Sequence, residues 1–137
     1  MNNRALDGLV VLDLTQMLAG PFCTMMLADQ GADVIKIEPP QGDMSRPLGP
    51  YFDDDVDREY GGYFQSINRN KRGLVLDLKE SDDKAVFLQL VEKADVLVEN
   101  FRLGVMDRLG LSYNKLQEIN PRLVYATIRG FGDPITG

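Results

Sequence analysis

Basic side chains gather between Asn68 and Lys79, in the segment NRNKRGLVLDLK, where only Asp77 is acidic. The cations of this segment are Arg69, Lys71, Arg72 and Lys79. A ligand with several phosphate groups requires such a cluster, because guanidinium and ammonium groups donate charge-assisted hydrogen bonds to phosphate oxygens. A solvated loop that balances the acidic run DDDVDRE, residues 53–59, accounts for the same charges equally well. The segment is therefore a candidate phosphate site with an open alternative.

A second candidate segment, ENFRLGVMDRLG, begins at Glu99 and follows an apolar run. Phe101 has the flat ring that stacks on a base, and Arg102 or Arg108 has the charge that meets a phosphate. From the residues alone, a place for Phe101 in the core is the favoured interpretation. Arg108 is equally explained by an ion pair with Asp107 or Glu99.

A third candidate is the segment Thr15–Gly20, TQMLAG, which joins an apolar run to the expected start of a helix. Backbone N–H groups and the helix dipole receive phosphate or carbonyl oxygens at such a junction. A compact turn at Gly20 and Pro21 explains the same residues, and alone it is the better interpretation. Glu38 ends the next apolar run, where dinucleotide sites place an acid for a ribose, but the G-x-G-x-x-G pattern is missing. NAD is therefore disfavoured.

Composition excludes several classes of function. The chain has 137 residues, a net charge of −6 and no histidine. An acidic protein lacks the basic field that nucleic acids and anionic membranes require. Without histidine, these residues form no histidine triad and few kinds of zinc site, so we expect no metal. The lone Cys23 and the absence of a long apolar run favour a cytoplasmic protein.

Strand and helix patterns alternate along the chain. We expect strands at 9–15, 32–38, 73–78, 95–101 and 123–128. We expect helices from Pro21 to a stop at Gly31, from Ser81 as the N-cap to Lys93, and in one or two segments within 105–119, with a helical turn at 60–67. This order predicts an α/β fold of the Rossmann-like, doubly wound type with a mostly parallel sheet, in which ligands gather at the carboxyl ends of strands. We expect residues 1–137 to be the first part of one large domain, since the last strand lacks its crossover helix.

Four blocks occur together in the order and spacing of one known family. They are LDGLVVLDLTQMLAGPFCTMMLADQGADVIKIE from Leu6, NRNKRGLVLDLK from Asn68, ADVLVENFRLGVMDRLGL from Ala94 and INPRLVYATIRGFG from Ile119. In these blocks the chain resembles the class III coenzyme A-transferases of the CaiB/BaiF type, which include formyl-CoA transferase-like enzymes. The resemblance covers nearly the whole chain.

The resemblance implies a coenzyme A site built from these blocks. The matching positions are Met17, Leu18 and Ala19 in the first βα loop, Leu76 and Lys79 beside the adenine and its phosphates, and Asn100, Phe101 and Arg108 after the fourth strand. Some family members carry an arginine directly after the glutamate of the second strand, whereas this chain has Pro39 there. The departure removes the phosphate contact that the resemblance implies at this position, and a cation elsewhere in the chain is the expected substitute.

The resemblance also implies a reaction. Family members transfer coenzyme A between an acyl-CoA thioester and a small carboxylic acid, through an aspartyl anhydride and an aspartyl-CoA thioester. The nucleophilic aspartate is expected beyond Gly137, and the complete enzymes are expected to be interlocked homodimers with a second, small domain. An α-methylacyl-CoA racemase of the same family and a noncatalytic module that binds coenzyme A are the alternatives.

Overall fold

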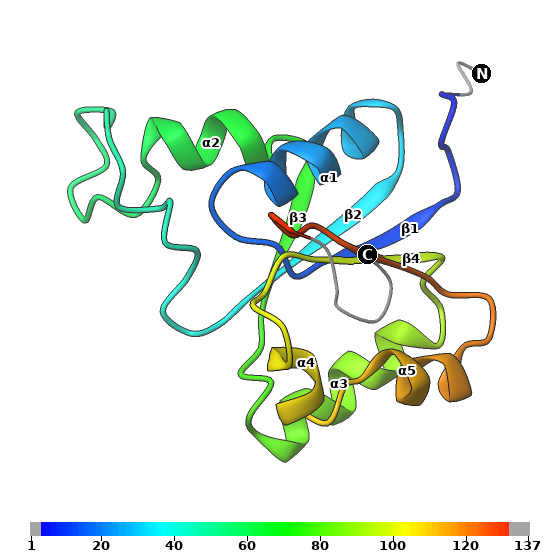
Figure 1. The fold of residues 1–137 in the computed structure, drawn as a ribbon. Helices are drawn as coiled ribbons and strands as arrows, with labels where there is room; N and C mark the ends of the chain where they lie inside the picture. The colour runs from blue at the N-terminus through cyan, green and yellow to red at the C-terminus, as the bar shows by residue number, and fades with distance from the viewer. Residues whose placement is uncertain (1–3, 132–137) are drawn as a thin grey trace.

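The computed structural model describes residues 4–131 and places its strands in one parallel sheet with the order β3-β2-β1-β4-β5 (Figure 1). The strands are β1 (Val10–Asp13), β2 (Asp33–Glu38), β3 (Lys71–Val75), β4 (Val96–Glu99) and β5 (Val124–Thr127). β1 pairs with both β2 and β4, so the strand order reverses there. The doubly wound α/β fold is confirmed, and its switch point lies between β1 and β4.

Helices cover the two faces of the sheet unequally (Figure 1). On one face lie α1 (Ala19–Asp29) and α2 (Gly62–Asn68). On the other lie α3 (Ser81–Val91), α4 (Val105–Arg108) and α5 (Tyr113–Ile119). A long excursion without helix or strand, residues 39–61, connects β2 to α2. Gly132, which closes the fourth block of family resemblance, lies outside the described residues.

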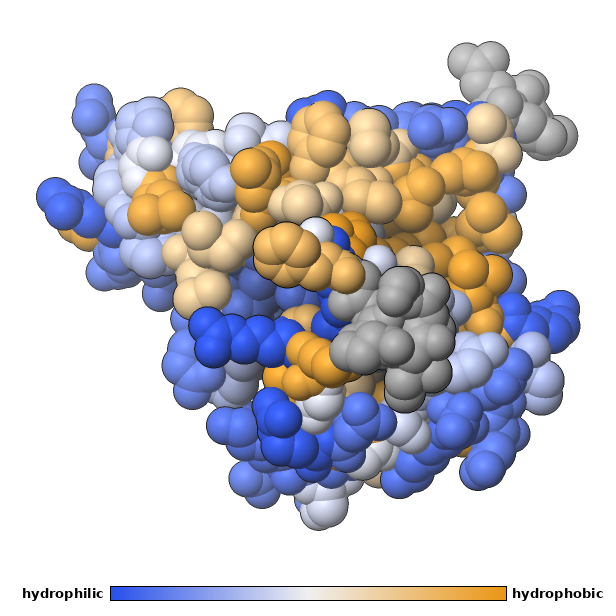
Figure 2. Space-filling model, viewed as in Figure 1, coloured by the Kyte–Doolittle hydropathy of each residue, from blue (hydrophilic) through white to orange (hydrophobic). Residues whose placement is uncertain are grey.

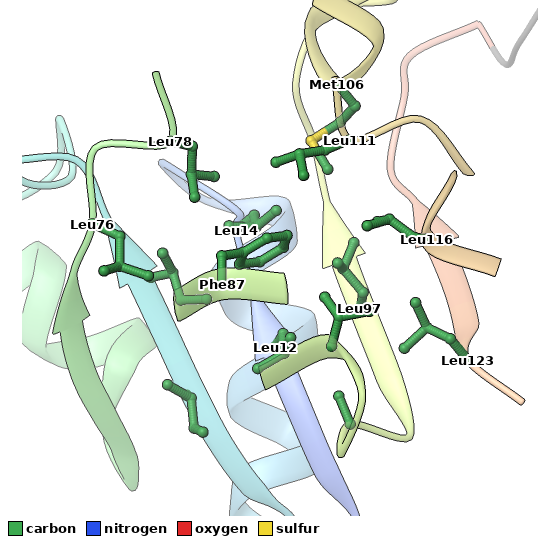
Figure 3. Packing of buried hydrophobic residues seen from close by; sticks show 14 residues of the cluster. Leu12, Leu14, Leu76, Leu78, Phe87, Leu97, Met106, Leu111, Leu116 and Leu123 are labelled. Atoms are coloured by element: carbon green, nitrogen blue, oxygen red, sulfur yellow. The ribbon is translucent and has the colours of Figure 1, made fainter. Parts of the chain in front are cut away.

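The main core lies between the sheet and α3, α4 and α5 (Figure 3). Phe87 of α3 is fully buried against Leu12 and Leu97 of the sheet, and Leu116 of α5 closes the same cluster. Burial of each such side chain contributes about 1.5–3 kcal/mol relative to exposure. On this face, the apolar side chains of the strands therefore form one continuous cluster with those of the helices.

The opposite face of the sheet is partly polar. Because side chains alternate along a strand, Ile35 and Ile37 of β2 face the main core, while Val34 and Lys36 face α1. Val34 joins a small apolar cluster with Val11 and Ala28. Nearer the carboxyl ends of the strands, this face carries charged side chains that are buried beneath α1.

The outer surface of α1 is apolar. Leu18, Phe22 and Met26, each one helical turn apart, are exposed. Figure 2 shows hydrophobic residues gathered over this helix, whereas the lower surface around α3 and α5 is hydrophilic. The two outer layers of the molecule therefore differ in character.

The third strand lies earlier in the sequence than the 73–78 we expected. β3 begins at Lys71, which pairs with Val34, and ends at Val75, which pairs with Glu38. Lys71 and Arg72 therefore belong to a strand and not to a basic loop, and Asp77 follows the strand. The apolar pattern misled the expectation because Leu76 and Leu78 are buried in the core although they lie in a loop.

The start of α3 also differs in one detail. Glu80 is the N-cap and Ser81 is the first helical residue, with no side-chain cap hydrogen bond. Asp83 in the first turn instead accepts a hydrogen bond from the backbone N–H of Asp77. The acidic first turn therefore anchors the loop that follows β3.

Replacement of Phe87 by alanine tests the main core. We expect Phe87→Ala to lower the free energy of unfolding by about 3–5 kcal/mol, because it leaves a cavity between α3 and the sheet. Val86→Ala, at an exposed position of the same helix, should change it by less than about 0.5 kcal/mol. Urea denaturation measures both, and equal effects would contradict the packing described here.

Candidate functional site

A cavity of about 170 Å³ opens at the carboxyl ends of β1, β2 and β3. Three of the site residues expected from the sequence, Leu76, Lys79 and Phe101, line it together. We call it the strand-end cavity. Segments separated by more than twenty residues in sequence thus meet at one edge of the sheet, as the parallel topology requires.

The walls of the strand-end cavity are mostly apolar. Leu14 and Ile37 contribute the ends of two strands, and Leu76 and Leu78 contribute the loop after β3. Phe101 is half-buried and packs against the main core, as the favoured interpretation expected, and it also lines the cavity. Polar groups of Gln16, Asp77 and Lys79 stand among these walls. Such a slot suits a flat, largely apolar group with polar atoms at its margin.

The first βα loop lies beside the cavity and is tied to the loop after β4. Asn100 accepts a hydrogen bond from the backbone N–H of Gln16 at 2.9 Å and donates one to its carbonyl at 2.8 Å. Asn100, Met17, Leu18 and Ala19 are therefore close together, with the last three exposed. In this structure, the side chain of Asn100 therefore holds the backbone of the first βα loop in place.

Met17 adopts a backbone conformation that is rare outside glycine. Its φ is 68°, in the left-handed region, which costs about 1–3 kcal/mol for an ordinary residue. Its N–H donates to Oδ1 of Asp43 at 3.3 Å. The N–H of Thr15 donates to Asp13. The amides of residues 15–17 thus have acceptors within the protein, so they are not open to a ligand, and the interpretation of this segment as a compact turn agrees with the structure better.

Arg108 lies on α4 and does not line the strand-end cavity. It is exposed, and among residues 4–131 it forms no ion pair. The expected alternative partners are wrong: Glu99 instead pairs with Arg129 at 2.7 Å. Arg108 therefore remains available at the surface of α4.

The basic segment 68–79 does not form one phosphate site. Arg69 pairs with Asp29 at 2.6 Å, and Arg72 pairs with Asp33 at 2.5 Å. Lys71 is buried against Asp13. These three cations each pair with an aspartate of the helix–sheet framework. They therefore form neither a phosphate-binding cluster nor a solvated loop that balances the acidic residues 53–59. Of the four cations of the segment, only Lys79 lines the strand-end cavity.

Buried ion pairs beneath α1 are the part of the site that sequence reasoning missed. Asp13 accepts hydrogen bonds from Thr15 at 2.5 Å, Thr24 at 2.7 Å and Lys71 at 2.9 Å. Lys36 donates to the carbonyl of Thr15 at 2.8 Å and lies 2.8 Å from Asp43. Charged residues inside otherwise apolar strand runs, VLD and VIKIE, are the signal that identifies them.

Glu38 closes this network at the end of β2. Both of its carboxylate oxygens accept hydrogen bonds from Arg46, at 2.6 and 2.7 Å, and one also accepts from the N–H of Asp43. Burial raises the pKa of Glu38, but the bonds from Arg46 and Asp43 outweigh it and leave the pKa below its ordinary value. The pKa of Asp43 is likewise lowered, since Lys36 and Ser45 outweigh the effect of burial. Glu38 is thus a structural anion, and its carboxylate is already bound.

A second cavity, of about 410 Å³, adjoins the first across Glu38 and Pro39. Arg46 and Arg58 line it. Arg46 is already bound to Glu38, whereas Arg58 is exposed and forms no ion pair in the described part of the chain. A cation without a carboxylate partner therefore stands near Pro39.

Within residues 4–131, no three histidine, cysteine, aspartate or glutamate side chains are grouped to hold a metal ion. In the same part of the chain, no helix is long and apolar enough to cross a membrane.

Comparison with known proteins identifies relatives along the whole chain. The model of CoA-transferase family III matches residues 6–136. A succinyl-CoA:mesaconate CoA-transferase from Haloarcula hispanica is 59% identical over 133 residues, which are 97% of this chain and 34% of that protein. An acetyl-CoA:oxalate CoA-transferase from Acetobacter aceti is 56% identical over 92% of this chain and 31% of its own. The chain therefore spans about a third of the length of the curated relatives it matches.

Solved structures agree with this relationship. A CAIB/BAIF family protein from Brucella suis superposes with a TM-score of 0.89 at 45% identity, covering 96% of this chain and 35% of that one. A hypothetical protein from Mycobacterium tuberculosis gives a TM-score of 0.85 at 39% identity, over 96% of this chain and 35% of that one.

The charge of Glu38 should be visible in the pH dependence of stability. Because its pKa is lowered in the folded protein, it contributes stability that is complete above its ordinary pKa of 4.5 and is lost as the pH falls through the lower folded value. We expect Glu38→Gln to flatten this acid limb of the unfolding free energy, measured by urea denaturation. Glu92→Gln, at an exposed glutamate, is the control that keeps the slope. A Glu38→Gln profile parallel to that of the unsubstituted protein would show that the ion pair with Arg46 is not stabilising.

Proposed function

The chain belongs to CoA-transferase family III, and from this membership we propose that it forms the coenzyme A-binding part of an enzyme that exchanges coenzyme A between an acyl-CoA thioester and a small carboxylic acid. One observation carries the assignment of the site. Leu76, Lys79 and Phe101, from two separate loops, line one cavity beside the first βα loop. A multiply phosphorylated carrier with a flat base fits such an arrangement of apolar walls and a rim cation.

The parts of coenzyme A match different parts of this edge of the sheet. The adenine occupies the apolar strand-end cavity, between Leu76 and Phe101. Lys79 and Arg108 meet the phosphates, and the exposed residues Met17, Leu18 and Ala19 receive the pantetheine arm. Asn100 contributes by holding the loop through Gln16.

Arg58 is the cation that replaces the arginine some relatives carry at the position of Pro39. It lines the cavity beside Pro39 and has no carboxylate partner among residues 4–131. Arg46 lines the same cavity, but Glu38 already neutralises it. A phosphate at this place therefore meets Arg58 first.

The proposed chemistry explains why the carrier must be held firmly. An aspartate carboxylate attacks the thioester carbonyl, so that a mixed anhydride forms and the coenzyme A thiolate leaves. The thiolate then attacks the aspartyl carbonyl, which releases the carboxylate of the donor and gives an aspartyl-CoA thioester. The acceptor acid reverses both steps. The thiolate leaves and returns twice, and a bound nucleotide keeps it beside the reacting carbonyl.

We place the nucleophilic aspartate of this mechanism outside the 137 residues. The curated relatives described above are named as transferases that act with mesaconate or oxalate, which favours transfer over the racemase alternative. We extend this to a short acyl-CoA donor and a small dicarboxylate acceptor for the complete enzyme. A cytoplasmic homodimer is the proposed form of that enzyme.

Binding of coenzyme A tests the site. We expect calorimetric titration to detect coenzyme A and not NAD, and we expect coenzyme A to raise the thermal midpoint of unfolding. Lys79→Ala should raise the Kd for coenzyme A about tenfold, because it removes a charge-assisted hydrogen bond. Lys93→Ala removes an exposed lysine just after α3 and serves as the control. Equal affinities for the two variants would place the nucleotide elsewhere.

A turnover assay tests whether these residues bind coenzyme A without catalysing its transfer. We expect the 137-residue chain to bind coenzyme A but to show no exchange between succinyl-CoA and mesaconate above the uncatalysed background. Exchange above background would show that an acid within these residues is the nucleophile. The assay follows the appearance of mesaconyl-CoA by chromatography.

A further inference from the structure

We propose that the buried pair of Lys36 and Asp43 positions the first βα loop for its ligand, although neither side chain lines the strand-end cavity. The proposal rests on the function assigned above and adds two positioning residues to it. Both side chains are almost completely buried and lie 2.8 Å apart. Each also makes a second contact, and these contacts are directed at the loop.

The two contacts hold the loop on either side of Gln16. Lys36 donates to the carbonyl of Thr15 at 2.8 Å, and Asp43 accepts from the N–H of Met17 at 3.3 Å. Asn100 fixes the residue between them through both of its backbone groups. Three side chains from separate segments therefore bind consecutive peptide groups of one loop.

These contacts explain why Met17 keeps a left-handed backbone conformation. A non-glycine residue keeps a left-handed conformation where contacts with the surrounding structure offset its energetic cost. Such residues are frequent at ligand-binding loops. Here the acceptor for the strained residue is Asp43, which is itself fixed by Ser45 and by the carboxylate of Glu38. The loop is thus held in advance in the shape that presents Leu18 and Ala19.

The pair also joins the loop to the excursion that follows β2. Asp43 belongs to residues 39–61, which carry Arg46 and Arg58 beside the second cavity. A displacement of the excursion at Asp43 would break the hydrogen bond to the N–H of Met17. Binding at the first βα loop is therefore coupled to the order of the excursion, and pre-organisation of this kind lowers the entropic cost of binding.

A double-mutant cycle distinguishes positioning from simple stabilisation. Asp43→Ala alone leaves a buried, unpaired ammonium and is expected to unfold the chain. Lys36→Met with Asp43→Ala removes both charges and preserves apolar volume, so the paired variant is the one to measure. It is made with and without Met17→Gly, because glycine adopts a positive φ without support. Asp29→Asn, which breaks the surface pair with Arg69, is the control.

The expected result is a difference between the two backgrounds. The paired substitution should raise the Kd for coenzyme A about tenfold when residue 17 is methionine, and less than about threefold when it is glycine. The loss of thermal stability should be the same in both backgrounds. Equal changes in Kd with methionine and with glycine, or no change in either, would overturn the proposal.

A second measurement needs no ligand. Amide hydrogen exchange of Met17, followed by nuclear magnetic resonance, should accelerate about tenfold or more in the paired variant and remain unchanged in Asp29→Asn. Unaltered exchange in the paired variant would overturn the proposal directly. If the unsubstituted chain fails to bind coenzyme A while Met17 loses its protection as expected, the assigned ligand is wrong and the positioning role stands.

Discussion

The arrangement of this domain depends on buried charge pairs on the face of the sheet that carries α1 and α2. Asp13 with Lys71 and Asp43 with Lys36 lie where a doubly wound fold usually places apolar side chains. Removal of one partner from such a pair is costly, because the remaining charge has no water to solvate it. The pairs therefore fix which residues approach each other, and they tie β1, β2, β3 and the first βα loop into one geometry.

The two faces of the sheet contribute different kinds of interaction. The face toward α3 and α5 supplies an apolar core. At the carboxyl ends of the strands, Leu76 and Phe101 belong both to this core and to the walls of the strand-end cavity. The face toward α1 supplies the hydrogen bonds that hold the loops beside that cavity. Apolar packing gives stability but little orientation, whereas hydrogen bonds and ion pairs have preferred directions. Apolar packing and directed polar contacts are both present at the carboxyl ends of β1 and β4.

Family membership and the geometry of the site support one another at different levels. The family model and the relatives establish that the chain belongs to CoA-transferase family III, and the cavity brings together three of the residues that we propose as contacts of the carrier. The proposed chemistry requires that a thiolate leaves and returns twice. A loop held rigidly beside the nucleotide serves such a reaction, because each return is then an intramolecular step.

The sequence by itself determined the order of strands and helices and the parallel sheet, because apolar periodicity and turn residues are local signals. It also singled out Leu76, Lys79 and Phe101, which the structure brings together. Only the tertiary structure decided the partners of the charges. Arg69, Lys71 and Arg72 resembled a phosphate cluster, yet each pairs with an acid that lies between 39 and 58 residues away along the chain. A charge in a sequence does not reveal its partner, since pairing depends on which strands become neighbours and which face each side chain occupies.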